Sequence, residues 1–283
     1  MLREDAKKLQ LTSVVDNRPL TSDVYHLILK APGLAAASKP GQFMMVKVAP
    51  GFEPALRRPF SLHRLDQETG QVEIIYQVLG KGTAILAQRK PDEQLEILGP
   101  LGNGFCLREG ERVGLVGGGM GIAPLLAAAE QAVQDGKEVV VFLGAKSGDY
   151  LLAQEEFERL GRVFVVTDDG SVGEKALVNK PLEEYLKNQQ LDLLLACGPT
   201  PMLKAVASIA NAREIPAQLS LEQRMGCGVG ACLGCVFPVK ADTSEGFIYK
   251  RVCHDGPVFW AHEALFSVPT EMNKQGGCTC GES

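Results

Sequence analysis

Gly114 to Pro124, GLVGGGMGIAP, is the stretch that decides the fold of this 283-residue chain. An apolar run that begins at Arg112 leads into it with the character of a buried strand, and a helical pattern follows it. Glycines at a strand-to-helix turn let the backbone approach a pyrophosphate, and the positive end of the helix dipole favours its charge. The stretch therefore predicts a parallel sheet with a dinucleotide site.

The spacing of these glycines departs from the standard dinucleotide fingerprint. Counted from Gly117, the third glycine position of G-x-G-x-x-G holds Ile122, and the usual later acidic residue is missing because the next strand ends in GAKS. A tight turn without a ligand is therefore an alternative for this stretch alone. Two further strands end in TDDGS (167–171) and CGPTPML (197–203), and ligands of parallel sheets bind at such ends. The candidate dinucleotide-binding residues at these ends are Gly117, Gly118, Gly119, Gly121, Asp168, Cys197, Gly198 and Pro199.

The chain divides into three regions that differ in their sequence pattern. Short alternating runs separated by turns fill residues 10 to about 105, as in an antiparallel barrel or sandwich, with one helix-like insert, TAILAQRK. Apolar runs then alternate with helical patterns to about residue 220, which indicates βαβ units. The remainder carries cysteines and little periodicity. The predicted fold is multi-domain: an antiparallel β-barrel (1–108), an α/β parallel-sheet nucleotide-binding domain (109–220) and a small C-terminal module (221–283).

Four cysteines of the last region follow the pattern C-x4-C-x2-C-x17-C. They are Cys227, Cys232, Cys235 and Cys253. Plant-type [2Fe–2S] ferredoxins use C-x4-C-x2-C and a distant fourth cysteine, and the interspersed glycines leave backbone N–H groups free to approach the anionic cluster. Structural zinc is the alternative, although zinc usually takes two C-x2-C pairs. Cys278 or Cys280 of the C-terminal tail is an alternative fourth ligand.

Composition excludes several classes of function. The net charge is −5 and no basic block occurs, which argues against nucleic acid as a partner. The N-terminus has no apolar signal segment, and the longest uncharged apolar run, Val113 to Ala129, holds five glycines and a proline, unlike a membrane span. We therefore expect a cytoplasmic protein without membrane contact, in which clustered cysteines serve metal or redox chemistry.

Two motifs in the barrel region carry candidate anion and heterocycle contacts. In RRPFSL (57–62), Arg58 can pair with a phosphate through two hydrogen bonds and Ser61 can bond a planar heterocycle. YQVLGKGT (76–83) ends a strand in a turn that enters a short helix, another start suited to an anion. For either motif alone, a solvated basic turn is the simpler interpretation.

The order of these motifs resembles that of the ferredoxin–NADP reductase superfamily, in which a barrel binds flavin and a following α/β domain binds a nicotinamide dinucleotide. With CGVGACLGC and YKRVCHDGPVF at the C-terminal end, the chain resembles the electron transfer subunits of NAD-dependent (class 1B) dihydroorotate dehydrogenases. The resemblance implies the four cysteines above as [2Fe–2S] ligands. It also implies an FAD site made of Arg58, Pro59, Phe60, Ser61, Ile75, Tyr76, Gln77, Gly82 and Thr83.

The resemblance further implies an activity and a partner. Electrons would pass from the FMN of a dihydroorotate dehydrogenase catalytic subunit, through the [2Fe–2S] cluster and FAD, to NAD⁺ in pyrimidine (UMP) biosynthesis. The partner would be that catalytic subunit, in a heterotetramer of two of each. The chain would be an oxidoreductase subunit with no catalytic acid, base or nucleophile of its own. Lys146 beside Ser147 leaves NADP open as far as the residues go.

Two other interpretations remain at this point. The first is the small subunit of an NADH-dependent ferredoxin–NADP oxidoreductase or a related sulfide dehydrogenase, families that often replace one cluster cysteine with aspartate. The second is a zinc-bound, non-enzymatic interaction module on a degenerate reductase scaffold. The intact RPFS and GKGT motifs argue against degeneration.

Overall fold

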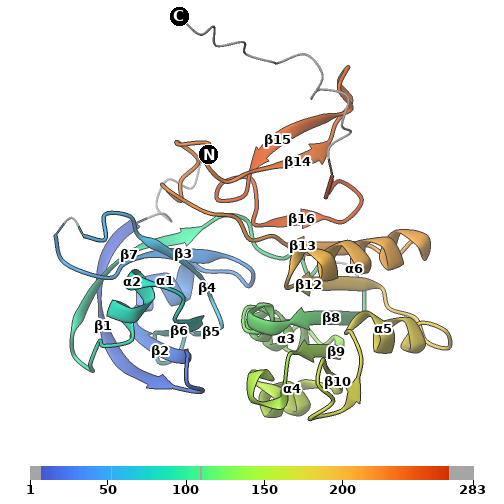
Figure 1. Cartoon of the computed structure of the whole chain (residues 1–283), viewed down its shortest axis with the longest axis horizontal. Helices are drawn as coiled ribbons and strands as arrows, with labels where there is room; N and C mark the ends of the chain where they lie inside the picture. The colour runs from blue at the N-terminus through green and yellow to red at the C-terminus, as the bar shows by residue number, and fades with distance from the viewer. Residues whose placement is uncertain (1–7, 52, 109, 268–283) are drawn as a thin grey trace, which may run out of the picture.

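The computed structural model describes residues 8–51, 53–108 and 110–267 (Figure 1). Two seven-stranded sheets and one two-stranded sheet make up its β-structure. Figure 1 shows the first sheet and the second side by side, with the third above them. Cys278 and Cys280, the alternative ligands, lie outside the described residues. No helix in the described ranges is long and apolar enough to cross a membrane.

The first sheet is antiparallel, with strand order β4-β3-β7-β1-β2-β6-β5, and confirms the predicted barrel. Its strands are β1 (Lys8–Pro19), β2 (Val24–Lys30), β3 (Phe43–Lys47), β4 (Arg58–Ser61), β5 (Arg64–Asp66), β6 (Gln71–Gln77) and β7 (Gln94–Leu101). Two short helices, α1 (Pro32–Ala37) and α2 (Lys81–Leu86), accompany it. Alternate apolar residues of these strands fill the barrel interior, since successive side chains of a strand point to opposite faces.

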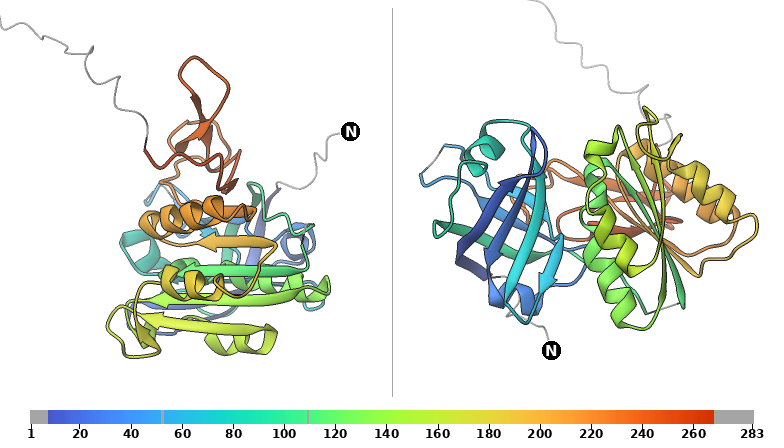
Figure 2. Two further views of the ribbon diagram at one scale, coloured as in Figure 1. Left: turned by 90° about the vertical axis from the view of Figure 1, so that its right-hand side faces the viewer. Right: turned by 90° about the horizontal axis from the view of Figure 1, so that it is seen from below.

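The second sheet has the order β11-β10-β9-β8-β12-β13-β16 and is parallel except at β16. Its strands are β8 (Arg112–Gly118), β9 (Glu138–Ala145), β10 (Arg162–Thr167), β11 (Glu174–Lys175), β12 (Leu193–Cys197), β13 (Ala217–Ser220) and β16 (Val258–Trp260). Between them lie η1 (Gly119–Ile122), α3 (Leu125–Gln134), η2 (Gly148–Tyr150), α4 (Gln154–Leu160), α5 (Asn179–Tyr185) and α6 (Thr200–Ala212). In Figure 2, α3 and α4 cover the face turned toward the barrel and α5 and α6 the opposite face. Continuous apolar runs therefore form these strands, because both faces are buried.

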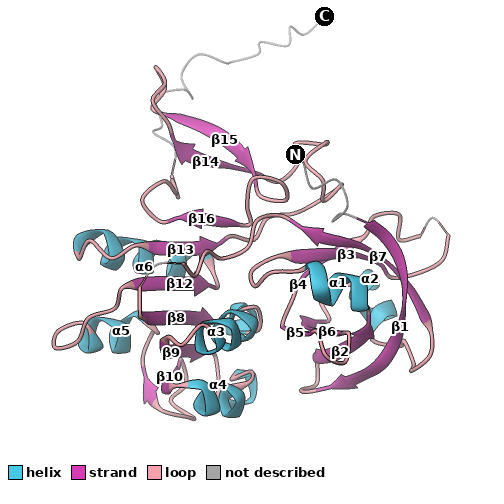
Figure 3. Cartoon of the chain, turned by 180° about the vertical axis from the view of Figure 1, so that it is seen from behind, coloured by secondary structure: helices cyan, strands magenta, loops and turns pink. Residues whose placement is uncertain are grey.

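The C-terminal part of the chain contacts both the barrel and the second sheet. β14 (Val236–Lys240) and β15 (Phe247–Arg251) form a hairpin, and β16 then pairs with β13 as the last strand of the second sheet (Figure 3). Asn103, at the end of the barrel, donates from its backbone N–H to the carbonyl of Gly256 at 2.6 Å and from its side chain to the carbonyl of Asp255 at 3.0 Å. The turn after Cys253 is therefore attached to the barrel.

Candidate functional site

The four cysteines of the C-x4-C-x2-C-x17-C pattern lie in one region of the C-terminal part of the chain. Three of them lie on the loop between β13 and β14, and Cys253 follows β15. The Gly230 N–H donates to the Cys253 Sγ at 3.1 Å, and the Cys253 N–H donates to the Cys235 Sγ at 3.3 Å. The Cys227 Sγ accepts the N–H groups of Val229 and Ala231 at 3.4 and 3.3 Å. Backbone donors therefore surround sulfur, as the glycine-rich sequence predicts.

The thiols interact in two pairs. Burial opposes ionisation of Cys227, but the N–H groups around it and the thiol of Cys232 outweigh that effect and lower its pKa to about 6. Burial, and then the neighbouring Cys235, raise the pKa of the Cys253 thiol to about 12. Within the described ranges, no three His, Cys, Asp or Glu side chains gather around one metal position. Two pairs of thiols fit a two-iron cluster, in which each iron takes two cysteines, better than one tetrahedral zinc.

The shape of the loop explains two of its glycines. Gly228 and Gly230 have φ of +73° and +84°, a region that favours glycine. A Cβ on Gly230 would lie 2.8 Å from the Cβ of His254. Arg251, a residue that the sequence did not single out, donates to the Gly230 carbonyl at 3.2 Å and pairs with Asp255 at 3.0 Å. Through these two contacts, Arg251 ties the loop to the turn that follows Cys253.

The candidate flavin residues come from β4, β6 and the start of α2. Arg58 lies on β4, and its side chain packs against Gly82 so closely that a Cβ there would be 2.5 Å from the Arg58 Nε. Ser61 is exposed at the end of β4. Beside them, Leu56 and Leu79 are 56% and 81% exposed. The polar residues of β4 and the backbone of Gly82 therefore lie next to exposed apolar side chains. This combination fits a ligand that has both phosphate and aromatic parts.

The residues of β6 and α2 are held by hydrogen bonds that fix the shape of this region. The Thr83 hydroxyl accepts the N–H groups of Leu79 and Gly80 at 3.0 and 3.3 Å, which shapes the turn into α2. Tyr76 stacks on Tyr25 and donates to the Asn17 side chain at 3.0 Å. Burial raises the pKa of Tyr76, so it is a hydrogen-bond donor throughout the neutral range.

Pro59, Phe60, Ile75 and Gln77 complete the candidate flavin set. Pro59 and Phe60 lie between Arg58 and Ser61 on β4, and the ring of Phe60 lies 5.5 Å from that of Tyr76. Ile75 is half-buried and packs toward the second sheet. Gln77 donates to Asp23 at 2.7 Å. The structure thus brings the whole set to adjacent elements of the barrel.

The candidate dinucleotide residues lie at the carboxyl ends of β8, β10 and β12, along one edge of the second sheet. The η1 turn packs directly on the end of β12, since a Cβ on Gly121 would collide with the Cys197 carbonyl. A Cβ on Gly118 would lie 2.5 Å from the Met202 Sδ, and Gly198 contacts the same side chain. Gly117 and Gly119 lie at the end of β8 and the start of η1, Pro199 lies directly before α6, and Asp168 is exposed just after β10. Close packing against the protein therefore accounts for Gly118, Gly121 and Gly198, and the approach of this turn to a pyrophosphate stays a prediction.

Cys197 is the last residue of β12 and is half-buried. Burial of its thiol raises the pKa to about 12, and a hydrogen bond with Ser220 only partly opposes this effect. The neutral thiol form of Cys197 is therefore favoured at physiological pH.

A buried polar network, which the sequence did not predict, joins the barrel to α3. His63, after β4, is 2% exposed; its Nδ1–H donates to the Ala123 carbonyl at 2.7 Å, and its own carbonyl accepts the Ala127 N–H at 3.0 Å. Arg64 donates to Glu130 on α3 at 2.8 Å. These contacts depend on residues about 60 positions apart, so no local pattern reveals them.

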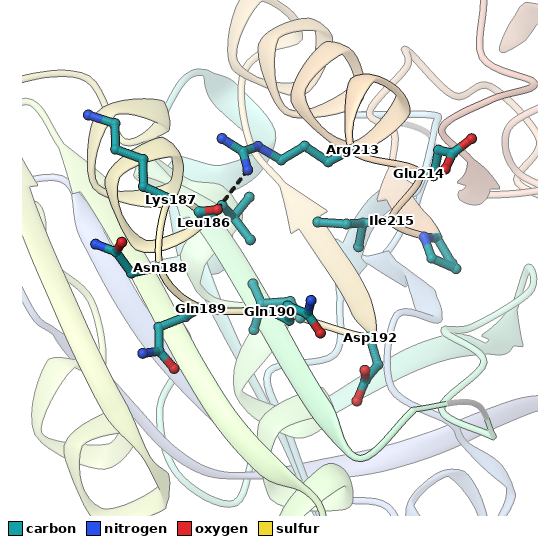
Figure 4. Close-up of a pocket in the computed structure, with 11 residues that line it drawn as sticks. Leu186, Lys187, Asn188, Gln189, Gln190, Asp192, Arg213, Glu214 and Ile215 are labelled. Atoms are coloured by element: carbon teal, nitrogen blue, oxygen red, sulfur yellow. Dashed lines mark hydrogen bonds between the residues drawn. The ribbon is translucent and has the colours of Figure 1, made fainter.

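One cavity lies away from these residues. It has a volume of about 750 Å³ and is lined by the segments before β12 and β13 (Figure 4). Arg213, Lys187 and Asp192 give it a polar wall. Ligands of parallel sheets bind at the carboxyl ends of the strands, and this cavity is at the amino ends, so we assign it no part in the site.

Comparison with known proteins agrees with this geometry. Residues 12–105 match the model of an oxidoreductase FAD-binding domain, and residues 115–208 that of an oxidoreductase NAD-binding domain. Residues 222–265 match the iron–sulfur cluster binding domain of dihydroorotate dehydrogenase B. The chain thus carries FAD-, NAD- and cluster-binding domains in the predicted order.

Relatives of known name cover nearly the whole chain. A protein of Caldanaerobacter subterraneus subsp. tengcongensis is 45% identical over 89% of this chain and 97% of its own length, and one of Bacillus caldolyticus is 44% identical with the same coverage. Both are named dihydroorotate dehydrogenase B (NAD(+)), electron transfer subunit. An NADH-dependent reduced ferredoxin–NADP oxidoreductase structure covers 90% of each chain at 30% identity with a TM-score of 0.80. The chain therefore belongs to the family of dihydroorotate dehydrogenase B electron transfer subunits, on the fold of the ferredoxin–NADP reductases.

Proposed function

We propose that this chain transfers electrons from the FMN of a dihydroorotate dehydrogenase catalytic subunit to NAD⁺, through a [2Fe–2S] cluster and FAD, in pyrimidine biosynthesis. The observation that carries the proposal is the grouping of three thiols of the β13–β14 loop with Cys253, where the loop packs against Met45 of β3, the strand that pairs with the flavin-motif strand β4. The names of the relatives support the substrate. We assign the FAD domain to residues 1–108, the NAD domain to 109–220 and the cluster module to 221–283.

The proposed cluster ligands are Cys227, Cys232, Cys235 and Cys253. A cluster exchanges single electrons, a nicotinamide exchanges a hydride, and a flavin is the group that can do both. The chain holds these groups in place. Arg58 would bind the FAD phosphates, with Gly82 leaving room for its guanidinium, and the exposed Ser61 would hydrogen-bond the flavin ring.

NAD is assigned to the carboxyl edge of the second sheet. Gly119, which has open space beside it, would let the backbone approach the pyrophosphate, Gly121 would keep η1 packed on the end of β12, and Asp168 would accept a hydrogen bond from the adenosine ribose. Lys146 lies in the neighbouring loop, where the Asp169 N–H donates to its carbonyl at 3.2 Å. The NAD-specific names of the relatives favour NAD over NADP here.

The proposed partner is the FMN-containing catalytic subunit, in a heterotetramer of two of each. Four apolar side chains on and near the cysteine loop are exposed: Val229, Leu233, Ile248 and Tyr249, at 41%, 61%, 43% and 58%. An exposed apolar group of this kind next to a redox site is typical of a docking surface. We place the complex in the cytoplasm, where thiols that bind a cluster stay reduced.

A native pull-down tests this function. The chain is isolated from its own cell extract, and the eluate is assayed for NADH formation from dihydroorotate and NAD⁺. We expect NADH, together with an FMN protein in equal amount. A yellow-brown eluate without this activity and with a larger iron–sulfur flavoprotein would contradict the proposal.

That second outcome would favour the ferredoxin–nicotinamide oxidoreductases. The observation in their favour is the similarity in structure to the NADH-dependent reduced ferredoxin–NADP oxidoreductase. This candidate is less well supported, because the identity is 30% against 45% for the named dihydroorotate dehydrogenase subunit.

A further inference from the structure

Strand β3 separates two cores with its alternating side chains. Met44 and Val46 lie in the core of the barrel interior. Phe43 and Met45 face the other way and join the core that contains Cys235 and Cys253. The period of two in a strand thus makes β3 a wall between the barrel and the cysteine module.

Met45 touches the cysteine loop directly. It is 0% exposed, and a Cβ built on Gly228 would lie 2.6 Å from its Cγ and 2.9 Å from its Sδ. Gly228 directly follows Cys227 and has φ of +73°. The loop can therefore lie this close to β3 only because the residue above Met45 is a glycine.

Met45 is also a direct neighbour of the strand that carries the flavin motif, β4. It is paired across the ladder with Pro59, one residue from Arg58 and two from Ser61. Directly opposed residues of an antiparallel pair project to the same face, with Cβ atoms about 4.5–5.5 Å apart. One side chain therefore contacts the loop that carries Cys227 and lies beside the strand that carries Arg58 and Ser61.

We infer that Met45 is a positioning residue that sets the separation between the cluster loop and the flavin-motif strand. The inference rests on the proposed function. Methionine suits this place because an unbranched, flexible thioether fills the irregular space under a loop without strain. Removal of its end would leave a cavity between loop and strand, into which the loop relaxes only in part.

The test compares Met45→Ala with Met44→Ala in the full chain carrying FAD and the cluster. The two changes remove equal volumes from adjacent buried positions, but Met44 points into the barrel. After rapid mixing with NADH, flavin and cluster reduction are followed separately by absorbance. Amide hydrogen exchange over residues 226–235 and the electron paramagnetic resonance spectrum of the dithionite-reduced cluster are measured in parallel.

In Met45→Ala we expect NADH to reduce the flavin at the wild-type rate and with the wild-type dependence on NADH. Cluster reduction should slow by about tenfold to a hundredfold, the range that a misplacement of roughly 1 Å can cause. Exchange over 226–235 should rise, while the resonance spectrum of the cluster stays the same. Met45→Leu should restore most of the rate, and Met44→Ala should change neither quantity.

The inference would be overturned if Met45→Ala showed the same rate of cluster reduction and the same amide exchange over residues 226–235 as the wild type. An equal slowing of cluster reduction in Met44→Ala would overturn it too. If Met45→Ala does not fold, Met45→Val is measured instead, with the same expectations. A wild-type chain whose cluster NADH does not reduce would contradict the proposed function itself, and the inference with it.

Discussion

His63 makes a pH-dependent contribution to stability that can be worked out from its surroundings. Its ring is buried between the barrel and α3, facing His26, Glu73 and Arg64. Burial lowers the pKa of His63 from 6.5 to about 4, although the Ala123 carbonyl and the Glu73 carboxylate favour the protonated form. The folded protein therefore keeps this imidazole neutral with its proton on Nδ1, which donates to the Ala123 carbonyl.

The sign and size of the effect follow from linkage. Between pH 4 and 6.5 the unfolded chain binds the proton and the folded chain does not, so stability is fully present above pH 6.5 and falls as the pH decreases. One pKa unit corresponds to about 1.4 kcal/mol, and between pH 7 and pH 5 the loss amounts to about 2 kcal/mol. This is a large part of the stability of a typical domain.

The assay compares the wild type with His63→Asn, which keeps a side-chain N–H donor but does not titrate. Urea unfolding of the chain loaded with FAD is followed by the fluorescence of released flavin at pH 7 and pH 5. We expect the wild type to lose about 2 kcal/mol more than the variant over this interval. Equal losses would show that His63 is not held neutral by burial, and would refute the reasoning.

Three further predictions concern single contacts. Gly82→Ala places a Cβ 2.5 Å from the Arg58 Nε, so FAD affinity measured by flavin fluorescence should fall about tenfold, whereas Gly80→Ala, which meets only open space, should leave it unchanged. Cys232→Ser should abolish the iron signal while NADH still reduces the flavin; loss of both would contradict the separation of the two sites. Tyr150→Phe removes the hydrogen bond from the Tyr150 hydroxyl to Asp23 of the barrel, so calorimetry should show that the free energy of unfolding falls by about 1 kcal/mol. An unchanged free energy of unfolding would contradict a stabilising role for this contact.

Local patterns predicted most of the fold because its elements have strong local signals. The apolar runs of β8, β9, β10 and β12 and the glycine turn at η1 identify the parallel sheet. β13 and β16 were not predicted. These strands have four and three residues, too few to show a clear periodic pattern. They also pair across about 40 positions of sequence, and a local pattern carries no information about such a distant partner.

Among the candidate functional residues, spacing predicted that the four cysteines belong to one site, because ligand spacing is itself the local signal of a cluster; the structure places them as two neighbouring pairs, and their role as ligands stays a prediction. It did not predict the contact of Met45 with Gly228 or that of His63 with Ala123. Each of these depends on which face of a strand meets a distant loop or helix. A single sequence contains both residues of each contact but does not show that they touch in the folded protein.

Metal analysis of the anaerobically purified chain tests the central claim most directly. Iron, zinc and acid-labile sulfide are counted per chain, and the dithionite-reduced protein is examined by electron paramagnetic resonance. Our account predicts two irons and two sulfides per chain with a signal from a reduced [2Fe–2S] centre. One zinc per chain, with no sulfide and no signal, would contradict it.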